Sequence, residues 1–256
     1  MSQSVVPVFE SKQIDTSPTL KFEEYRFYQT DSDLQYELYK GKLIPMPTAT
    51  VLHIKICEYL VYKLQRYLAE HNLDLVAKIG LGVRTEEDTS RIPDVVVCTQ
   101  SLLEQAAAIP GAGILDFEEK PLLVIEVVSQ NRRADYVIKR AEYELANLPE
   151  YVIVDPTPNK QLVRVLAFPE GEEIYRQTDF LPGQQMVSLV FPNLTLSVNE
   201  ILSPPLVEEL IKEEQARLQE LEQQAAVQRQ HADEQRQRAE RLAAKLRELG
   251  VDPDSI

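Results

Sequence analysis

Cysteine is scarce in this sequence, and long apolar runs are missing. The two cysteines, Cys57 and Cys98, lie in apolar surroundings, so we expect small buried hydrophobic side chains rather than a disulfide framework or a zinc site. No apolar stretch approaches the roughly 20 residues that span a bilayer. The N-terminal residues also lack a basic region followed by an apolar stretch, so no secretory signal is expected. A cytoplasmic location without membrane contact follows as the expectation.

Positive charge is also in short supply. Lysine and arginine together number 27 against 41 aspartate and glutamate residues, and the formal net charge is −14. This deficit argues against a broad basic surface for non-specific binding of nucleic acids. It does not exclude a local basic groove, because a metal site contributes positive charge of its own.

Hydrophobic residues make up 44% of the chain, which is enough for a sizeable core, and their patterns predict the elements. The alternating run over 34–46, with Gly41 inside it, predicts a β-hairpin. Thr50 is placed to cap a helix over about 51–70. We expect strands near 74–85, 92–98, 121–128, 151–154 and 162–166, a helix over 132–147, and a surface excursion over 100–120.

This order of elements predicts an α/β fold with a mixed central sheet flanked by helices. The strand–helix–strand unit over 121–154 should be a parallel crossover. Apolar contacts expected for the first helix are Leu52, Cys57, Leu60, Val61, Leu64 and Leu68. Those expected for the second are Ala134, Val137, Ile138, Ala141, Tyr143 and Leu145.

Two of the predicted buried strands carry a carboxylate. Asp94 precedes Val95-Val96-Val97, and Glu126 lies within the apolar run 121–128. A buried carboxylate is normally paired, protonated or bound to a cation, and two on neighbouring strands are typical of a hard-metal site. In the alternative, structural interpretation, Asp94 closes a turn and Glu126 pairs with Arg91 or Lys139.

A set of short motifs follows in order between residues 20 and 203. The motifs are Tyr36-Glu37-Leu38 with Gly41, His53, Arg91-x-Pro93-Asp94, Glu126-Val127-Val128-Ser129, Asp135-x-x-x-Lys139 and Glu150-Tyr151-Val152-Ile153-Val154-Asp155-Pro156. Their order resembles the Uma-two-type family of restriction endonucleases, within the PD-(D/E)xK nuclease superfamily. Each motif alone is weak, and the ordered set carries the resemblance.

The resemblance implies a restriction-endonuclease-like core and a metal-dependent endonuclease that hydrolyses phosphodiester bonds, with DNA as its partner. Asp94 matches the superfamily's first acid and Glu126 its second. The lysine that normally follows two residues later is replaced by Val128, and Lys139 on the next helix fits its role. Asp94 and Glu126 would bind Mg²⁺ or Mn²⁺, with the Val127 backbone carbonyl as a third ligand.

Three further residues are candidates for the site, each with an alternative. Glu37 in the hairpin either approaches the metal or faces water. His53 either joins the site or is a partly buried, hydrogen-bonded helix histidine. Arg91 either contacts phosphate or neutralises Asp94. The rival function is a catalytically silent nuclease-fold module that acts in protein binding or assembly.

The C-terminal segment differs in composition from the rest. Residues 206–250 contain no glycine or proline before Gly250 and are rich in Gln, Glu, Ala, Arg and Leu. Apolar positions spaced three and four apart predict a long helix that forms a coiled coil, most simply in a homodimer. Alanine and glutamine weaken the centre of this seam, so a solitary solvated helix is the alternative. The expected domains are a flexible tail over 1–19, the nuclease-like domain over 20–205, this helix, and a tail over 251–256.

Overall fold

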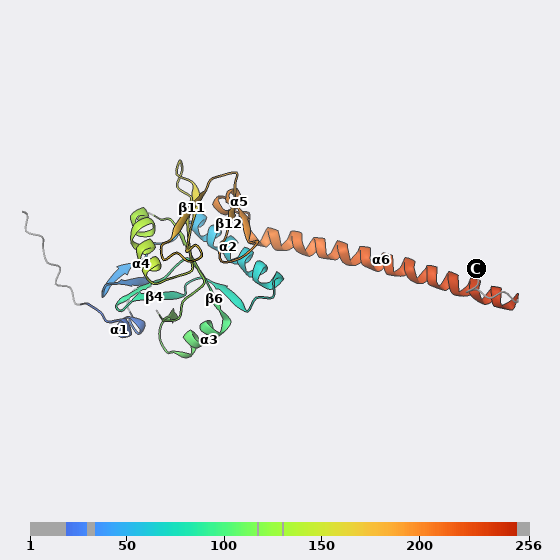
Figure 1. Cartoon of the computed structure of the whole chain (residues 1–256), viewed down its shortest axis with the longest axis horizontal. Coiled ribbons are helices and arrows are strands. Elements are labelled where there is room, and N and C mark those ends of the chain that lie inside the picture. Colours follow the sequence, from blue (N-terminus) through green and yellow to red (C-terminus); the bar gives the residue numbers. More distant parts are fainter. Residues whose placement is uncertain (1–18, 30–33, 117, 130, 250–256) are drawn as a thin grey trace, which may run out of the picture. The chain divides into compact units, whose positions relative to one another are not determined.

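The computed structural model describes residues 19–29, 34–116, 118–129 and 131–249 (Figure 1). The chain divides into two units, Met1–Pro204 and Pro205–Ile256. The predicted tails over 1–19 and 251–256 lie outside the described residues, apart from residue 19. None of the described helices combines the length and the apolar composition that crossing a membrane requires.

The first unit contains a six-stranded mixed sheet in the order β11-β10-β9-β8-β6-β3. Its strands β8 and β9 run parallel, and all its other neighbours are antiparallel. Every residue of β8 and β9 is buried, which explains their nearly continuous apolar runs. The strands are β3 (Leu75–Lys78), β6 (Val95–Thr99), β8 (Leu123–Val127), β9 (Glu150–Asp155), β10 (Leu162–Ala167) and β11 (Arg176–Phe180).

A second sheet has the order β2-β1-β5-β4-β7, and a third pairs β12 with β13. The predicted hairpin is present, and its turn residues Lys40 and Gly41 both have positive φ, 50° and 78°, as a two-residue hairpin turn requires. The strands are β1 (Tyr36–Tyr39), β2 (Lys42–Pro45), β4 (Gly82–Glu86), β5 (Thr89–Arg91), β7 (Ile114–Leu115), β12 (Gln185–Val187) and β13 (Thr195–Ser197).

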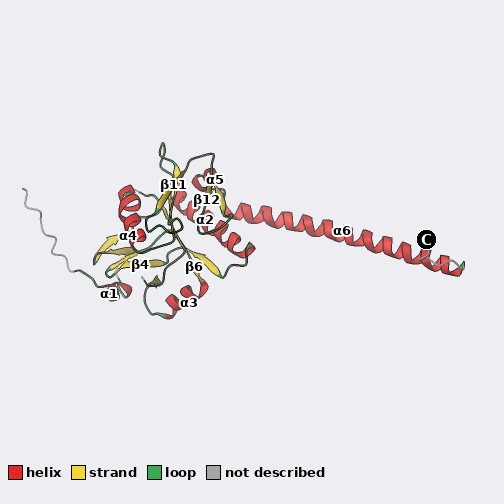
Figure 2. Ribbon diagram, viewed as in Figure 1, coloured by secondary structure: helices red, strands yellow, loops and turns green. Residues whose placement is uncertain are grey.

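Helices accompany these sheets, so the mixed α/β fold predicted from the sequence is confirmed (Figure 2). The helices of the first unit are α1 (Phe22–Arg26), α2 (Val51–Glu70), α3 (Gln100–Ala108), the π-helical turn η1 (Ala134–Lys139), α4 (Arg140–Leu145) and α5 (Val198–Leu202). The predicted cap of α2 is also confirmed, since Thr50 Oγ1 accepts a hydrogen bond of 3.2 Å from the His53 amide. Leu52, expected on the buried face of α2, is 40% exposed.

Two predictions along the chain were wrong. The expected surface excursion over 100–120 contains helix α3, capped by the Thr99 side chain, and strand β7, which pairs in parallel with β4. The reason is an apolar face, since Leu102 and Ala106 lie one helical turn apart and are both buried. The single strand expected over 74–85 is divided into β3 and β4, with Gly80 at φ +69° between them.

The second unit is dominated by α6 (Val207–Glu248), a helix of 42 residues. Glu208 and Glu209 lie in its first turn, and Lys245 and Arg247 in its last, where they complement the helix dipole. None of its described residues is buried. The predicted long helix is therefore present, and its pairing with another helix stays a prediction.

Candidate active site

The two predicted acids lie beside each other at one end of the six-stranded sheet. Asp94 immediately precedes β6, whose Val95 is paired with Ile125 of β8, and Glu126 is the next residue along β8. The Asp94 Oδ2 atom accepts a hydrogen bond of 2.6 Å from the Val127 amide. The donor in this contact is the Val127 amide. The metal ligand predicted from the sequence is a different atom, the Val127 carbonyl oxygen.

Asp94 is also held by helix α2. The His53 Nε2 atom lies 2.8 Å from Asp94 Oδ1, and both side chains are mostly buried. The hydrogen bond that the Asp94 carboxylate accepts raises the pKa of His53 above its usual value, although burial acts in the opposite direction. His53 therefore orients the Asp94 carboxylate.

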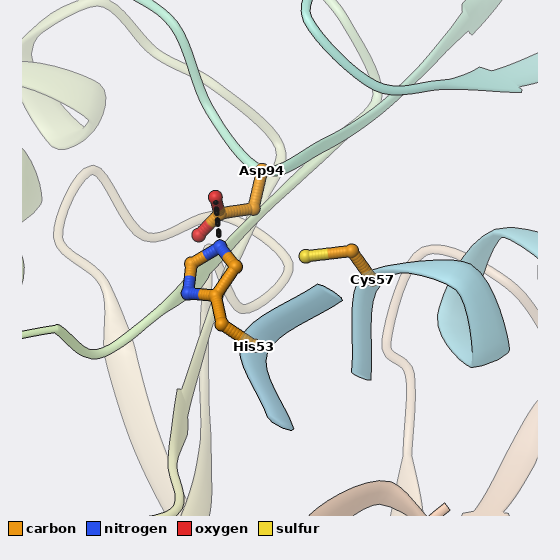
Figure 3. A group of neighbouring side chains, drawn as sticks. All are labelled: His53, Cys57 and Asp94. Carbon is orange, nitrogen blue, oxygen red and sulfur yellow. Dashed lines mark hydrogen bonds and ion pairs between the residues drawn. The ribbon is translucent and has the colours of Figure 1, made fainter. Parts of the chain in front are cut away.

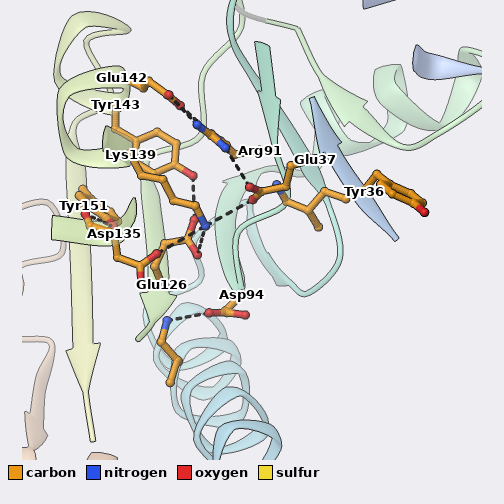
Figure 4. A network of polar contacts seen from close by, with 12 residues as sticks. Tyr36, Glu37, Arg91, Asp94, Glu126, Asp135, Lys139, Glu142, Tyr143 and Tyr151 are labelled. Carbon is orange, nitrogen blue, oxygen red and sulfur yellow. Dashed lines mark hydrogen bonds and ion pairs between the residues drawn. The ribbon is translucent and has the colours of Figure 1, made fainter. Parts of the chain in front are cut away.

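Lys139 lies among three carboxylates (Figure 4). Its Nζ atom is 2.8 Å from Glu126 Oε2, 3.3 Å from Glu37 Oε1 and 3.6 Å from Asp135 Oδ1. Burial alone would lower the pKa of Lys139, but these carboxylates outweigh it and raise that pKa above its usual value. The ammonium is therefore charged at neutral pH.

The carboxylates around Lys139 are themselves perturbed by burial. Glu126 is 3% exposed and accepts a 3.0 Å hydrogen bond from the Tyr143 hydroxyl. Burial, together with the charges of Asp94, Glu37 and Asp135, raises the pKa of Glu126 well above its usual range against the opposing effect of Lys139. Burial raises the pKa of Asp135 to about 6 against the same ammonium. Burial thus disfavours the charged form of both groups, and a nearby cation favours it.

Negative charge exceeds positive charge in this cluster. Four carboxylates (Glu37, Glu126, Asp135 and Glu142) pair with two permanent cations (Arg91 and Lys139). Asp94 lies beside Glu126 at the end of the sheet, so the five carboxylates leave −3 when all are ionised. A protonated His53 reduces this excess to −2. Uncompensated charge in a buried site is strongly unfavourable. The residues present therefore fit a divalent cation with oxygen ligands.

Arg91 pairs with Glu37 and Glu142, so the alternative in which it neutralises Asp94 is wrong. Its Nε and Nη2 atoms donate to the two oxygens of Glu142 at 2.7 and 2.6 Å, and Nη1 donates to Glu37 at 3.0 Å. The guanidinium also stacks over the Tyr39 ring. Arg91 is only 5% exposed, which favours a positioning role for it over contact with phosphate. Glu37 is likewise 5% exposed, so the expectation that it faces water is wrong.

The segment 134–145 turns its charged face inward. Asp135, Lys139 and Glu142 are buried, whereas Val137 and Leu145, both expected in the core, are 54% and 75% exposed. The cause is the ion-pair network, which holds the charged face against β1, β5 and β8. The wide π-helical turn η1 carries two of these residues, and such turns are frequent at functional sites.

Asp135, Glu142 and the Tyr143 hydroxyl belong to the charged cluster around Lys139, although none of them was predicted there from the sequence. A signal was available for the first two. Asp135, Lys139 and Glu142 are spaced four and three residues apart, which places them on one helical face. For Tyr143, the burial was expected, but nothing in the sequence pattern indicates the partner of its hydroxyl.

Cys57 lies close to the site, one helical turn beyond His53 (Figure 3). One donor atom each from His53, Cys57 and Asp94 lie within 4.8 Å of one another. Burial raises the pKa of the Cys57 thiol, and the charges of Asp94 and Glu126 raise it further. Cys98, in contrast, is fully buried within the apolar core, as expected.

Comparisons with known proteins agree with the fold and with the family that the sequence resembles. The Uma2 family, described as "Putative restriction endonuclease", matches residues 22–199. A crystal structure described as a putative nuclease belonging to DUF820, from Anabaena variabilis ATCC 29413, is similar with a TM-score of 0.52 and 20% identity, and the match covers 68% of this chain and 93% of that one. At this identity the likeness shows the fold alone. No curated protein matches the chain.

Proposed function

Since the chain belongs to the Uma2 family of putative restriction endonucleases, we propose that it is a metal-dependent endonuclease that hydrolyses phosphodiester bonds in DNA. The observation that carries this proposal is the buried cluster in which carboxylates outnumber cations around Lys139. A nuclease site of this class needs hard oxygen ligands and a cationic group beside them. The cluster offers both at the end of one sheet.

In this proposal, Asp94 and Glu126 hold Mg²⁺ or Mn²⁺, with the Val127 carbonyl as a further ligand. Asp135 and Glu37 reach the same ammonium as Glu126, and they supply the remaining negative charge near the ion. When bound, such an ion polarises a phosphoryl oxygen and makes a nearby water more acidic.

The protein's own side chains then have separate roles. Lys139 remains protonated, because three carboxylates raise its pKa, and it orients the attacking water or balances the negative charge that grows on the phosphate. His53 and the Val127 amide orient Asp94, and the Tyr143 hydroxyl orients Glu126. Arg91 holds Glu37 and Glu142 in place as a positioning residue.

The strongly acidic chain affects how DNA is bound. With a net charge of −14, the protein lacks the general electrostatic attraction that drives non-specific binding. We therefore propose that DNA engages locally, at the metal and Lys139, and that affinity in the absence of metal is low. We propose the cytoplasm as the location of this activity.

A second candidate function is a catalytically silent module. It is favoured by the contact between Lys139 and Glu126, because an ammonium 2.8 Å from that carboxylate already supplies a cation to it. In such a protein the buried network would serve the fold, and α6 would serve assembly. A degenerate site of this kind should not bind Mn²⁺, so calorimetry with Mn²⁺ separates the two functions.

The deciding experiment is a cleavage assay on supercoiled and single-stranded DNA with Mg²⁺ or Mn²⁺. Asp94→Asn is the matched control, since it keeps the shape of the side chain and removes its charge. We expect cleavage by the parent protein and none by this variant. Equal cleavage by both would point to a contaminating nuclease, and the absence of both cleavage and calorimetric Mn²⁺ binding would support the catalytically silent module.

We also propose that α6 forms a parallel or antiparallel coiled coil in a homodimer, separate from a nuclease domain over 20–205. Leu218, Leu221 and Leu242 are each more than half exposed on α6. Leucines spaced in this way bury apolar area when they pack against a second helix. The alanine- and glutamine-rich centre makes this association modest and dependent on concentration.

A further inference from the structure

His53 and Cys57 lie on the same face of α2, because they are four residues apart in a helix. Both side chains approach Asp94 in the segment before β6 (Figure 3). Two further contacts fix the arrangement. The Thr50 cap holds the first turn of α2 through the His53 amide, and the Val127 amide holds one oxygen of Asp94.

The three donor atoms are an imidazole nitrogen, a thiol sulfur and a carboxylate oxygen, all within 4.8 Å of one another. In a tetrahedral zinc site, neighbouring donor atoms lie roughly 3.4–3.6 Å apart. Small side-chain adjustments are therefore enough to bring the three donors around one ion. The ion would enter where His53 Nε2 and Asp94 Oδ1 now meet at 2.8 Å.

We propose that His53, Cys57 and Asp94 bind a thiophilic divalent metal ion of the Zn²⁺ and Co²⁺ class. Sulfur and imidazole donors select these ions over Mg²⁺, which prefers oxygen ligands and an octahedral shell. Three protein ligands leave a fourth position for water or a further ligand, as in zinc sites that are not purely structural.

This ion would share Asp94 with the Mg²⁺ or Mn²⁺ site. The coupling between the two ions rests on the proposed function, whereas the binding of the thiophilic ion does not. Because one carboxylate serves both ions, occupancy of one site changes the affinity of the other.

The test is a Co²⁺ titration of the full chain after removal of bound metals, followed by absorbance. Thiolate coordination produces a sulfur-to-cobalt charge-transfer band in the near ultraviolet, and we expect an intensity that corresponds to one thiolate-bound Co²⁺ per chain. The band should be lost in Cys57→Ala and retained in the matched variant Cys98→Ala, which removes the other buried thiol. Absence of the band in the parent protein, or an equal band in Cys57→Ala, would overturn the proposal.

Two further variants keep the test decisive if Cys57→Ala is poorly folded. His53→Ala changes a partly exposed side chain, and it should weaken Co²⁺ binding by more than the roughly 10–100-fold typical of losing an outer-shell partner. Glu126→Gln should retain the band while it removes Mn²⁺-dependent cleavage. Loss of the band in Glu126→Gln, or unchanged Co²⁺ affinity in His53→Ala, would overturn the three-ligand assignment. The absorbance readout is independent of DNA cleavage, so a failure of this site and a failure of the nuclease proposal are separately visible.

Discussion

Replacing Lys139 with methionine keeps most of the length of the unbranched side chain but removes the cation that Glu126, Glu37 and Asp135 share. Breaking a buried ion pair from one side typically destabilises a protein by about 3–5 kcal/mol. Domains of this size have a free energy of unfolding of roughly 5–15 kcal/mol. We therefore expect a folded but less stable variant, in which protonation of Glu126 and Asp135 absorbs part of the loss.

The effect on turnover should exceed the effect on metal binding. Loss of one electrostatic contact to the reacting groups typically lowers the rate by about 10²–10³-fold, whereas the proposed metal ligands remain in place. Saturating Mn²⁺ at about 100 times its dissociation constant adds roughly 2.7 kcal/mol to the folded state, so the variant can be assayed while folded.

The assay is single-turnover cleavage of supercoiled DNA with Mn²⁺, together with calorimetry of Mn²⁺ binding and chemical unfolding. Lys160→Met is the matched control, because Lys160 is exposed and lies in a turn. Cleavage by Lys139→Met at the parent rate, under conditions in which Asp94→Asn is inactive, would remove Lys139 from the mechanism.

Three further predictions test other parts of the molecule. Glu126→Gln should weaken Mn²⁺ binding in calorimetry. The metal-free variant should be at least as stable as the metal-free parent protein, because burial and neighbouring acids disfavour the charged Glu126. A large loss of stability in the metal-free variant would contradict this. Burial raises the pKa of Asp155, but hydrogen bonds from Thr157, Arg132 and Tyr136 outweigh it and lower that pKa below its usual value. The stability that the ionised Asp155 contributes is therefore present above about pH 4 and lost as the pH falls through the folded-state pKa. Asp155→Asn should lower the free energy of unfolding by about 1–3 kcal/mol at pH 7 and by less near pH 3. A difference in urea unfolding that does not change with pH would refute this prediction. Truncation after residue 204 should leave a folded domain and lower the number of chains per particle measured by light scattering. The same number of chains per particle in both proteins at matched concentrations would show that α6 does not self-associate.

Much of the fold could be predicted from local pattern. The apolar runs of β8 and β9 are long because both faces of these strands are buried. The α2 cap and the β1–β2 hairpin rest on contacts between residues close in sequence, so composition and spacing are enough to predict them. Two carboxylates on predicted buried strands indicated a metal site, and the roles of Asp94, Glu126 and Lys139 are what the family resemblance implies for its ordered motifs.

The tertiary structure alone decided which face of 134–145 points inward. An apolar pattern predicts that Val137 and Leu145 are buried, but both are exposed. Their opposite face meets Glu37 and Arg91, which lie on strands far away in the sequence. Ion pairs between elements depend on how the strands are ordered in the sheets, and no local period encodes that order.

Long-range packing also explains why the contacts of Arg91 and Cys57 could not be predicted. The partners of Arg91 are Glu37 and Glu142, 54 and 51 residues away, and nothing in the sequence around Arg91 indicates either of them. The position of Cys57 beside Asp94 likewise depends on how α2 packs against the strands. The sequence by itself determined which residue types and elements are available, and long-range packing determined which charged and sulfur groups meet.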